Sequence, residues 1–196
     1  MFGKSSGGYG AAWHGMHRAD FWDAISINSG DMGFDALFIP ALFDDLDLLR
    51  KYDNSIEKFV RAVEAQPKIK DKERMALMDF AMGAFYDPDP TQFRNMRLPL
   101  DPHTGELIPE RWNNWMKHDP VLMFDTKGEE LRKLKAIYMD CGNHDQFRIH
   151  YGMRRFHKKL EAAGVAHLYQ EYEDDHSDVD YRMDLFLPFL AKVLSD

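Results

Sequence analysis

Apolar residues along this chain occur in two patterns. Some form short uninterrupted runs, and others recur every three or four positions over longer stretches, as in a helix. Runs at 24–28, 135–140 and 165–172 are typical of buried strands. Apolar residues three or four positions apart predict helices over 8–18, 44–65, 72–85, 149–163 and 180–194, with a further helical turn at 129–134.

From residue 135 onward the predicted order is strand, helix, strand, helix. That alternation is typical of a parallel sheet with helices packed on its faces. The predicted fold class is therefore α/β, with a small, mainly parallel sheet. With 196 residues the chain can bury a core of its own, because a domain of about 150 residues already buries roughly 70% of its extended surface. We expect a single domain over 1–196.

The block from 34 to 117 does not follow the strand and helix alternation, and we interpret it as a helical, lid-like insertion. Asp44 and Asp45 are placed to cap the N-terminus of the helix predicted over 44–65. Between 87 and 109 prolines replace periodic apolar residues, which predicts an ordered but irregular loop.

Charge and composition narrow the classes of function. The net charge of -8 disfavours nucleic acid as a partner, because phosphate backbones require a clustered positive surface. No apolar run of about 18 residues and no basic-then-apolar leader is present, so we expect no membrane association and a cytoplasmic protein. The single cysteine, Cys141, excludes an intramolecular disulfide and a multi-cysteine metal site. We expect no cofactor and no metal.

A candidate nucleophile lies at the start of the chain, where Gly3-Lys4-Ser5-Ser6-Gly7 matches the pattern G-x-S-x-G. In this pattern the serine stands on a sharp turn between a strand and a helix, and small flanking residues allow the two elements to approach. The helix predicted directly afterwards favours this interpretation over a plain flexible loop. Ser5 is thus the candidate nucleophile, and the backbone N–H of Ser6 is the expected oxyanion donor.

A serine hydroxyl needs an imidazole to take its proton and a carboxylate to orient that imidazole. Asp145 follows the strand predicted at 135–140, and His176 follows the one at 165–172. Both positions and their order in the chain suit a Ser-His-Asp triad. Asp140 is the competing acid, but it falls within or at the very end of its strand.

Other assignments of these residues stay open. A metal site could be built from His144, Asp145, Asp174, His176 and Asp178, although their spacing matches no standard metal-binding loop. Lys4, Trp112 and Trp115 are candidate substrate-binding residues, and the tryptophans are equally explained by ordinary core packing.

Three segments carry a resemblance to a known family: G-K-S-S-G-G-Y-G-A, D-C-G-N-H-D-Q-F and E-D-D-H-S-D with the helix that follows it. They resemble the α/β-hydrolase esterases that include esterase D, S-formylglutathione hydrolase and enterochelin esterase relatives. The resemblance implies acyl transfer to water, with Ser5 as nucleophile, His176 as general base and then acid, and Asp145 as the orienting carboxylate.

Members of that family carry several strands before the nucleophile, including the strand that leads into it, and also a second oxyanion donor. We expect this chain to lack them all and to form a truncated α/β-hydrolase fold. The exposed sheet edge predicts a homo-oligomer, such as a dimer. The expected function is a serine esterase acting on small carboxylic esters. The alternatives are a catalytically incompetent interaction or binding module, and acyl transfer to an alcohol or thiol.

Overall fold

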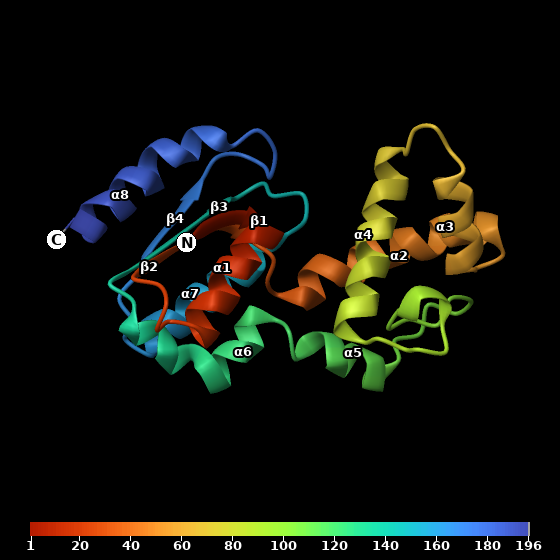
Figure 1. The fold of residues 1–196 in the computed structure, drawn as a ribbon, viewed down its shortest axis with the longest axis horizontal. Coiled ribbons are helices and arrows are strands. Elements are labelled where there is room, and N and C mark those ends of the chain that lie inside the picture. The colour runs from red at the N-terminus through yellow and green to blue at the C-terminus, as the bar shows by residue number, and fades with distance from the viewer. Residues whose placement is uncertain (196) are drawn as a thin grey trace. The chain divides into compact units, whose positions relative to one another are not determined.

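The computed structural model describes residues 1–195, and these form two compact units (Figure 1). We call residues 1–37 with 119–196 the sheet unit and residues 38–118 the helical unit. The sheet unit contains β1 Phe2–Ser5, α1 Ser6–His17, β2 Ala24–Gly30, α6 Pro120–Lys127, β3 Ala136–Gly142, α7 Ile149–Ala162, β4 Leu168–Tyr172 and α8 Met183–Ser195. The helical unit contains most of α2 Phe34–Leu49, then α3 Ile56–Glu64, α4 Asp71–Tyr86 and α5 Pro109–Met116.

The four strands form one parallel sheet in the order β1-β2-β3-β4. Every residue of β2 and β3 is buried, as expected for central strands that are covered on both faces. Helix α8 lies on one face, and α1 and α7 lie on the other (Figure 1). The predicted α/β class is confirmed, and the strands predicted from apolar runs correspond to β2, β3 and β4.

The strand that leads into Ser5 is present, so the expectation that the chain lacks it was wrong. Residues Phe2–Ser5 form β1, which pairs in parallel with β2, Phe2 opposite Ser26. These four residues show no alternation of apolar and polar side chains, so their sequence alone does not predict a strand. The hydrogen bonds with β2 stabilise their extended conformation. Because β1 is at the edge of the sheet, self-association through its outer side stays a prediction.

Small residues allow α1 to pack closely on the sheet. A Cβ atom at Gly8 would lie 2.7 Å from Cα of Gly30, so only glycine permits this separation of helix and strand.

On the opposite face Phe186 and Leu190 of α8 pack against Tyr138 and its neighbours in the sheet. This cluster includes Ala24 and Ala136, the first residues of β2 and β3, so α8 covers the sheet from the amino ends of its central strands.

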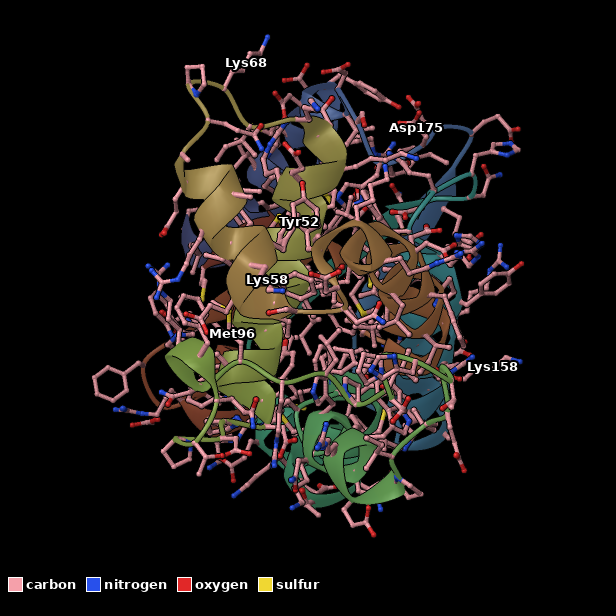
Figure 2. All side chains as sticks on the ribbon, turned by 90° about the vertical axis from the view of Figure 1, so that its right-hand side faces the viewer. Tyr52, Lys58, Lys68, Met96, Lys158 and Asp175 are labelled. Atoms are coloured by element: carbon pink, nitrogen blue, oxygen red, sulfur yellow. The ribbon has the colours of Figure 1, made fainter. Side chains whose placement is uncertain are left out.

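The helix predicted over 44–65 is two helices. Helix α2 ends at Leu49, and after a 3-10 turn Asp53 and Asn54 adopt positive φ. The Ser55 side chain then caps α3 by accepting a hydrogen bond from the backbone N–H of Lys58 at 3.2 Å. Tyr52 and Lys58 flank this break (Figure 2). The prediction that Asp44 and Asp45 cap a helix was also wrong, because both lie inside α2.

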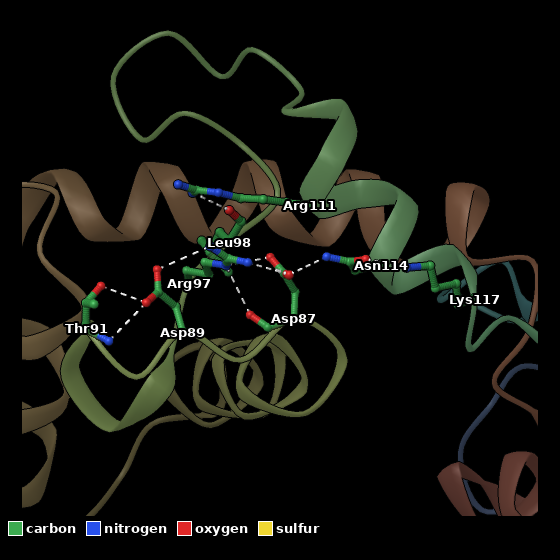
Figure 3. Close-up of polar contacts among 8 residues, drawn as sticks. All are labelled: Asp87, Asp89, Thr91, Arg97, Leu98, Arg111, Asn114 and Lys117. Carbon is green, nitrogen blue, oxygen red and sulfur yellow. Dashed lines mark hydrogen bonds and ion pairs between the residues drawn. The ribbon is translucent and has the colours of Figure 1, made fainter.

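The proline-rich loop of the helical unit is ordered by one arginine. Arg97 donates two hydrogen bonds to the carboxylate of Asp87, each 2.6 Å long, and one to Asp89 at 3.2 Å (Figure 3). Asn114 of α5 donates to the same Asp87 carboxylate at 2.6 Å. This bidentate pair joins the end of α4, the loop and α5, so a segment without periodic apolar residues still has a defined path.

Two buried carboxyl groups meet in the helical unit, Asp45 on α2 and Asp79 on α4. Burial, with the neighbouring Asp79, raises the pKa of Asp45 to about 9, and the pair therefore holds a proton at neutral pH. The raised pKa means that the folded state prefers the protonated form. The contribution of this pair to the free energy of unfolding is fully present below the unfolded pKa of about 4, and it is lost as the pH rises towards 9.

We expect Asp45→Asn to remove this pH dependence, because an amide donates to Asp79 at every pH. At pH 9 the free energy of unfolding should rise by about 2 kcal/mol relative to the wild type, with little change at pH 4. Thermal unfolding followed across this range measures the effect, and Asp47→Asn, at an exposed position of α2, is the matched control. Parallel pH curves for wild type and Asp45→Asn would contradict the shared proton.

Within residues 1–195, no helix is both long enough and apolar enough to cross a membrane.

Candidate active site

Ser5 stands on a strained turn between β1 and α1. Its backbone has φ 58° and ψ -126°, a conformation that costs a non-glycine residue about 1–3 kcal/mol and is concentrated at functional sites. A Cβ atom at Gly3 would lie 2.4 Å from the carbonyl carbon of Gly7. The first and last glycines of the G-x-S-x-G pattern therefore touch each other, which is the physical reason for that spacing.

Ser6 is the first residue of α1. The first N–H groups of a helix have no intrahelical acceptor, and the helix dipole adds partial positive charge there. The N–H of Ser6 is therefore available to an anion that forms beside Ser5.

His176 and Asp145 are hydrogen-bonded to each other. The distance from Nδ1 of His176 to Oδ2 of Asp145 is 2.7 Å, and both residues are buried. Because a carboxylate can only accept, we infer that Nδ1 carries the proton and that Nε2 of the neutral ring has a free lone pair. The backbone N–H of Phe147 donates to the other oxygen of Asp145 at 2.9 Å, which orients the carboxylate.

The loops that carry Asp145 and His176 are joined to each other by backbone hydrogen bonds. Asn143 N–H donates to the carbonyl of Tyr172 at 2.9 Å, and His144 N–H to that of Asp174 at 3.0 Å. At Gly142 a Cβ atom would lie 2.3 Å from the carbonyl oxygen of Asp174. The close approach of these loops thus depends on a glycine, and it places the imidazole against the carboxylate.

Asp31, which the sequence patterns did not single out, also belongs to this site. Its carboxylate accepts a hydrogen bond from the Ser5 hydroxyl at 3.3 Å and another from the Ser6 hydroxyl at 2.7 Å. In the described part of the chain, residues 1–195, no hydrogen bond joins Ser5 to His176. Asp31 directly follows β2, so the position after a strand that singled out Asp145 was also a signal for Asp31.

Asp31 is 5% exposed, and burial raises the pKa of its carboxyl group. Hydrogen bonds from Ser6 and Ser5 and the nearby His176 lower the pKa in part, while the charge of Asp145 raises it. Asp31, His176 and Asp145 therefore interact electrostatically with one another at the carboxyl ends of the strands.

Asp140, the competing acid, is held by other partners. Its two carboxylate oxygens accept hydrogen bonds from Asn28 at 2.8 Å, from Arg182 at 3.0 Å and from the Tyr138 hydroxyl at 3.2 Å. Asp140 thus belongs to a buried network between the sheet and the segment before α8.

Lys4, with Asn28, Asp140 and Arg182, lines a pocket in the sheet unit, and its role in substrate binding stays a prediction. Trp115 is completely buried in the helical unit, where its ring packs edge-on against Phe38 at 5.3 Å between centroids. Trp115 thus lies in the core of the helical unit, and its role as a substrate-binding residue stays a prediction. Trp112 is half-buried in the same unit, and its role stays a prediction.

The metal alternative finds no support in the geometry. Among residues 1–195, no group of three or more histidine, cysteine, aspartate or glutamate side chains is arranged to bind a metal ion.

The cysteine beside Asp145 is a buried thiol: Sγ of Cys141 lies 3.8 Å from Oδ2 of Asp145. Burial raises the pKa of Cys141 well above its usual range, so this thiol stays protonated.

Comparison with known proteins finds a similarity in structure. No family model and no curated protein match the chain. Among solved structures the chain is similar to a ferulic acid esterase, at 19% sequence identity and a TM-score of 0.48. The similarity covers 98% of this chain and 50% of the other, so the chain spans about half the length of that protein. The family resemblance of the sequence motifs stays a prediction.

Proposed function

We propose that this protein is a serine hydrolase that cleaves carboxylic esters through an acyl-enzyme on Ser5. The observation that carries the proposal is the buried hydrogen bond of 2.7 Å between His176 and Asp145, at the sheet edge where Ser5 occupies a strained turn. A strained nucleophile, an imidazole with one free nitrogen and a carboxylate that orients it are the parts that acyl transfer requires.

In the proposed reaction, Oγ of Ser5 attacks the ester carbonyl carbon while Nε2 of His176 takes the hydroxyl proton. The resulting oxyanion accepts a hydrogen bond from the Ser6 N–H, and one such donor contributes roughly 3 kcal/mol to transition-state stabilisation. His176 then gives the proton to the departing alcohol. A water molecule, activated by the same imidazole, attacks the acyl-enzyme and releases the acid.

A second candidate is a binding module that keeps these residues without turnover. The hydrogen bond from Ser5 to Asp31 instead of His176 favours it. The two candidates differ in the reactivity of Ser5, because a serine without an acting general base is not nucleophilic at neutral pH.

Labelling with a fluorophosphonate tests the proposed function directly. In this reaction Ser5 Oγ forms a bond to phosphorus, fluoride leaves, and the hydroxyl proton passes to His176. We expect one phosphonyl group per chain, located on Ser5 by peptide mass spectrometry, and no label after heat denaturation. A folded chain that remains unlabelled at Ser5 would refute the hydrolase and favour the binding module.

A further inference from the structure

The Asp31 carboxylate contacts two hydroxyl groups, and one of them belongs to the proposed nucleophile. It accepts from Ser5 at 3.3 Å and from Ser6 at 2.7 Å, and its own backbone N–H donates to the Ser5 carbonyl at 3.3 Å. Asp31 is 5% exposed, so water does not compete freely for these contacts. This buried carboxyl group has no role in the Ser5-His176-Asp145 scheme.

The Ser5 hydroxyl has a single proton and can donate it in only one direction. While Asp31 is a carboxylate it can only accept, and the Ser5 proton is held towards it and away from His176. As a carboxylic acid Asp31 can instead donate to Ser5 Oγ, and the serine proton is then free to turn to Nε2 of His176. The two protonation states of Asp31 thus favour opposite orientations of the nucleophile.

We propose that Asp31 is a positioning residue that sets the direction of the Ser5 hydroxyl proton, permitting attack as a carboxylic acid and opposing it as a carboxylate. The inference rests on the proposed function of Ser5. It identifies a built-in control of the nucleophile that acts through a hydrogen bond and not through contact with substrate.

The groups around Asp31 determine the pH at which this control acts. Ser5 and Ser6 from the elbow, His176 after β4 and Asp145 after β3 all influence it, and burial is the largest effect on the pKa of Asp31, which it raises. Tyr9 on α1 also lies near: burial and the charges of Asp119 and Asp31 raise the pKa of Tyr9 to about 12. Tyr9 is therefore neutral over the working range.

The sign of the pH effect follows from this arrangement. Below its raised pKa Asp31 is a carboxylic acid, and the Ser5 proton is free to turn to His176. Above the raised pKa of Asp31 the carboxylate holds the Ser5 proton, and the rate falls. This falling limb of the pH profile belongs to Asp31.

The test measures the rate of Ser5 phosphonylation by a fluorophosphonate from pH 5 to 10 in the wild type, Asp31→Asn and Ser6→Ala. In the wild type the rate should fall up to about tenfold per pH unit on the alkaline side. The amide introduced by Asp31→Asn is neutral at every pH, so this variant should lose the fall in rate on the alkaline side. Ser6→Ala removes a hydrogen bond to the carboxylate and should move the falling limb about one unit higher.

An alkaline limb that is unchanged in both variants would overturn the role of Asp31 while leaving the labelled nucleophile intact. Should Asp31→Asn not fold, the shift in Ser6→Ala decides alone, because that variant removes only an exposed hydroxyl. Absence of labelling in the wild type at every pH would refute the proposed function itself, and the two failures are thus distinguishable.

Discussion

Replacing Ser5 by alanine is expected to reduce the hydrolysis of a short-chain p-nitrophenyl ester by about 10⁴-fold or more. The reason is that the proposed acyl-enzyme forms on Oγ of Ser5, and alanine has no atom that can form this bond. The measurement compares initial rates at matched protein concentration, with circular dichroism to verify the fold. Ser195→Ala, which changes an exposed serine near the end of α8, is the matched control and should keep the wild-type rate.

Equal rates in the wild type and Ser5→Ala, both above the control without protein, would indicate hydrolysis by surface groups. That result would show that the proposed site is not the source of the esterase activity. A rate that vanishes only in Ser5→Ala would establish Ser5 as the nucleophile.

The second large effect is expected at Asp145. Asp145→Asn should lower kcat by roughly 10³–10⁴-fold with little change in the folded structure. The amide keeps the shape of the carboxylate, but it no longer requires a proton on Nδ1 of His176 and does not stabilise the imidazolium. The ring can then carry its proton on Nε2 instead of Nδ1. A protonated Nε2 cannot accept the proton of the Ser5 hydroxyl, so proton transfer fails.

Asp140→Asn is the informative companion because Asp140 was the rival acid. Its carboxylate pairs with Arg182 at 3.0 Å, and both side chains are nearly buried. Removing one partner of a buried ion pair should cost about 3 kcal/mol in the free energy of unfolding, while kcat of the folded protein is retained. The opposite pattern, with activity lost in Asp140→Asn and kept in Asp145→Asn, would assign the acid to Asp140.

Several features of the candidate site could be predicted without a structure because their signals are local. Ser5 was recognised from glycines two residues away on either side, and the elbow geometry explains that spacing. Asp145 and His176 were recognised because each follows an apolar run, and in a parallel sheet such loops share one edge. The hydrogen bond between them agrees with this reasoning.

Other features depended on partners distant in the sequence. Asp31 contacts Ser5 and Ser6 only because β2 pairs beside β1. Its position directly after a strand indicates that it lies at the carboxyl edge of the sheet, but it does not indicate which side chains it contacts. The burial of Trp115 and the pairing of Asp45 with Asp79 likewise depend on packing within the helical unit. Hydrophobic spacing cannot tell a ring that lines a pocket from one that fills a core.

The sequence by itself determined the α/β class, three of the four strands and the positions of Ser5, Asp145 and His176, because hydrophobic period and turn chemistry act over a few residues. Only the tertiary structure decided that Phe2–Ser5 is a strand, that the 44–65 segment breaks in two, and that a buried carboxyl group accepts a hydrogen bond from the proposed nucleophile. These outcomes depend on hydrogen bonds and packing between residues that are far apart in the chain, or on backbone conformations such as those at Asp53 and Asn54, and local patterns carry little information about either.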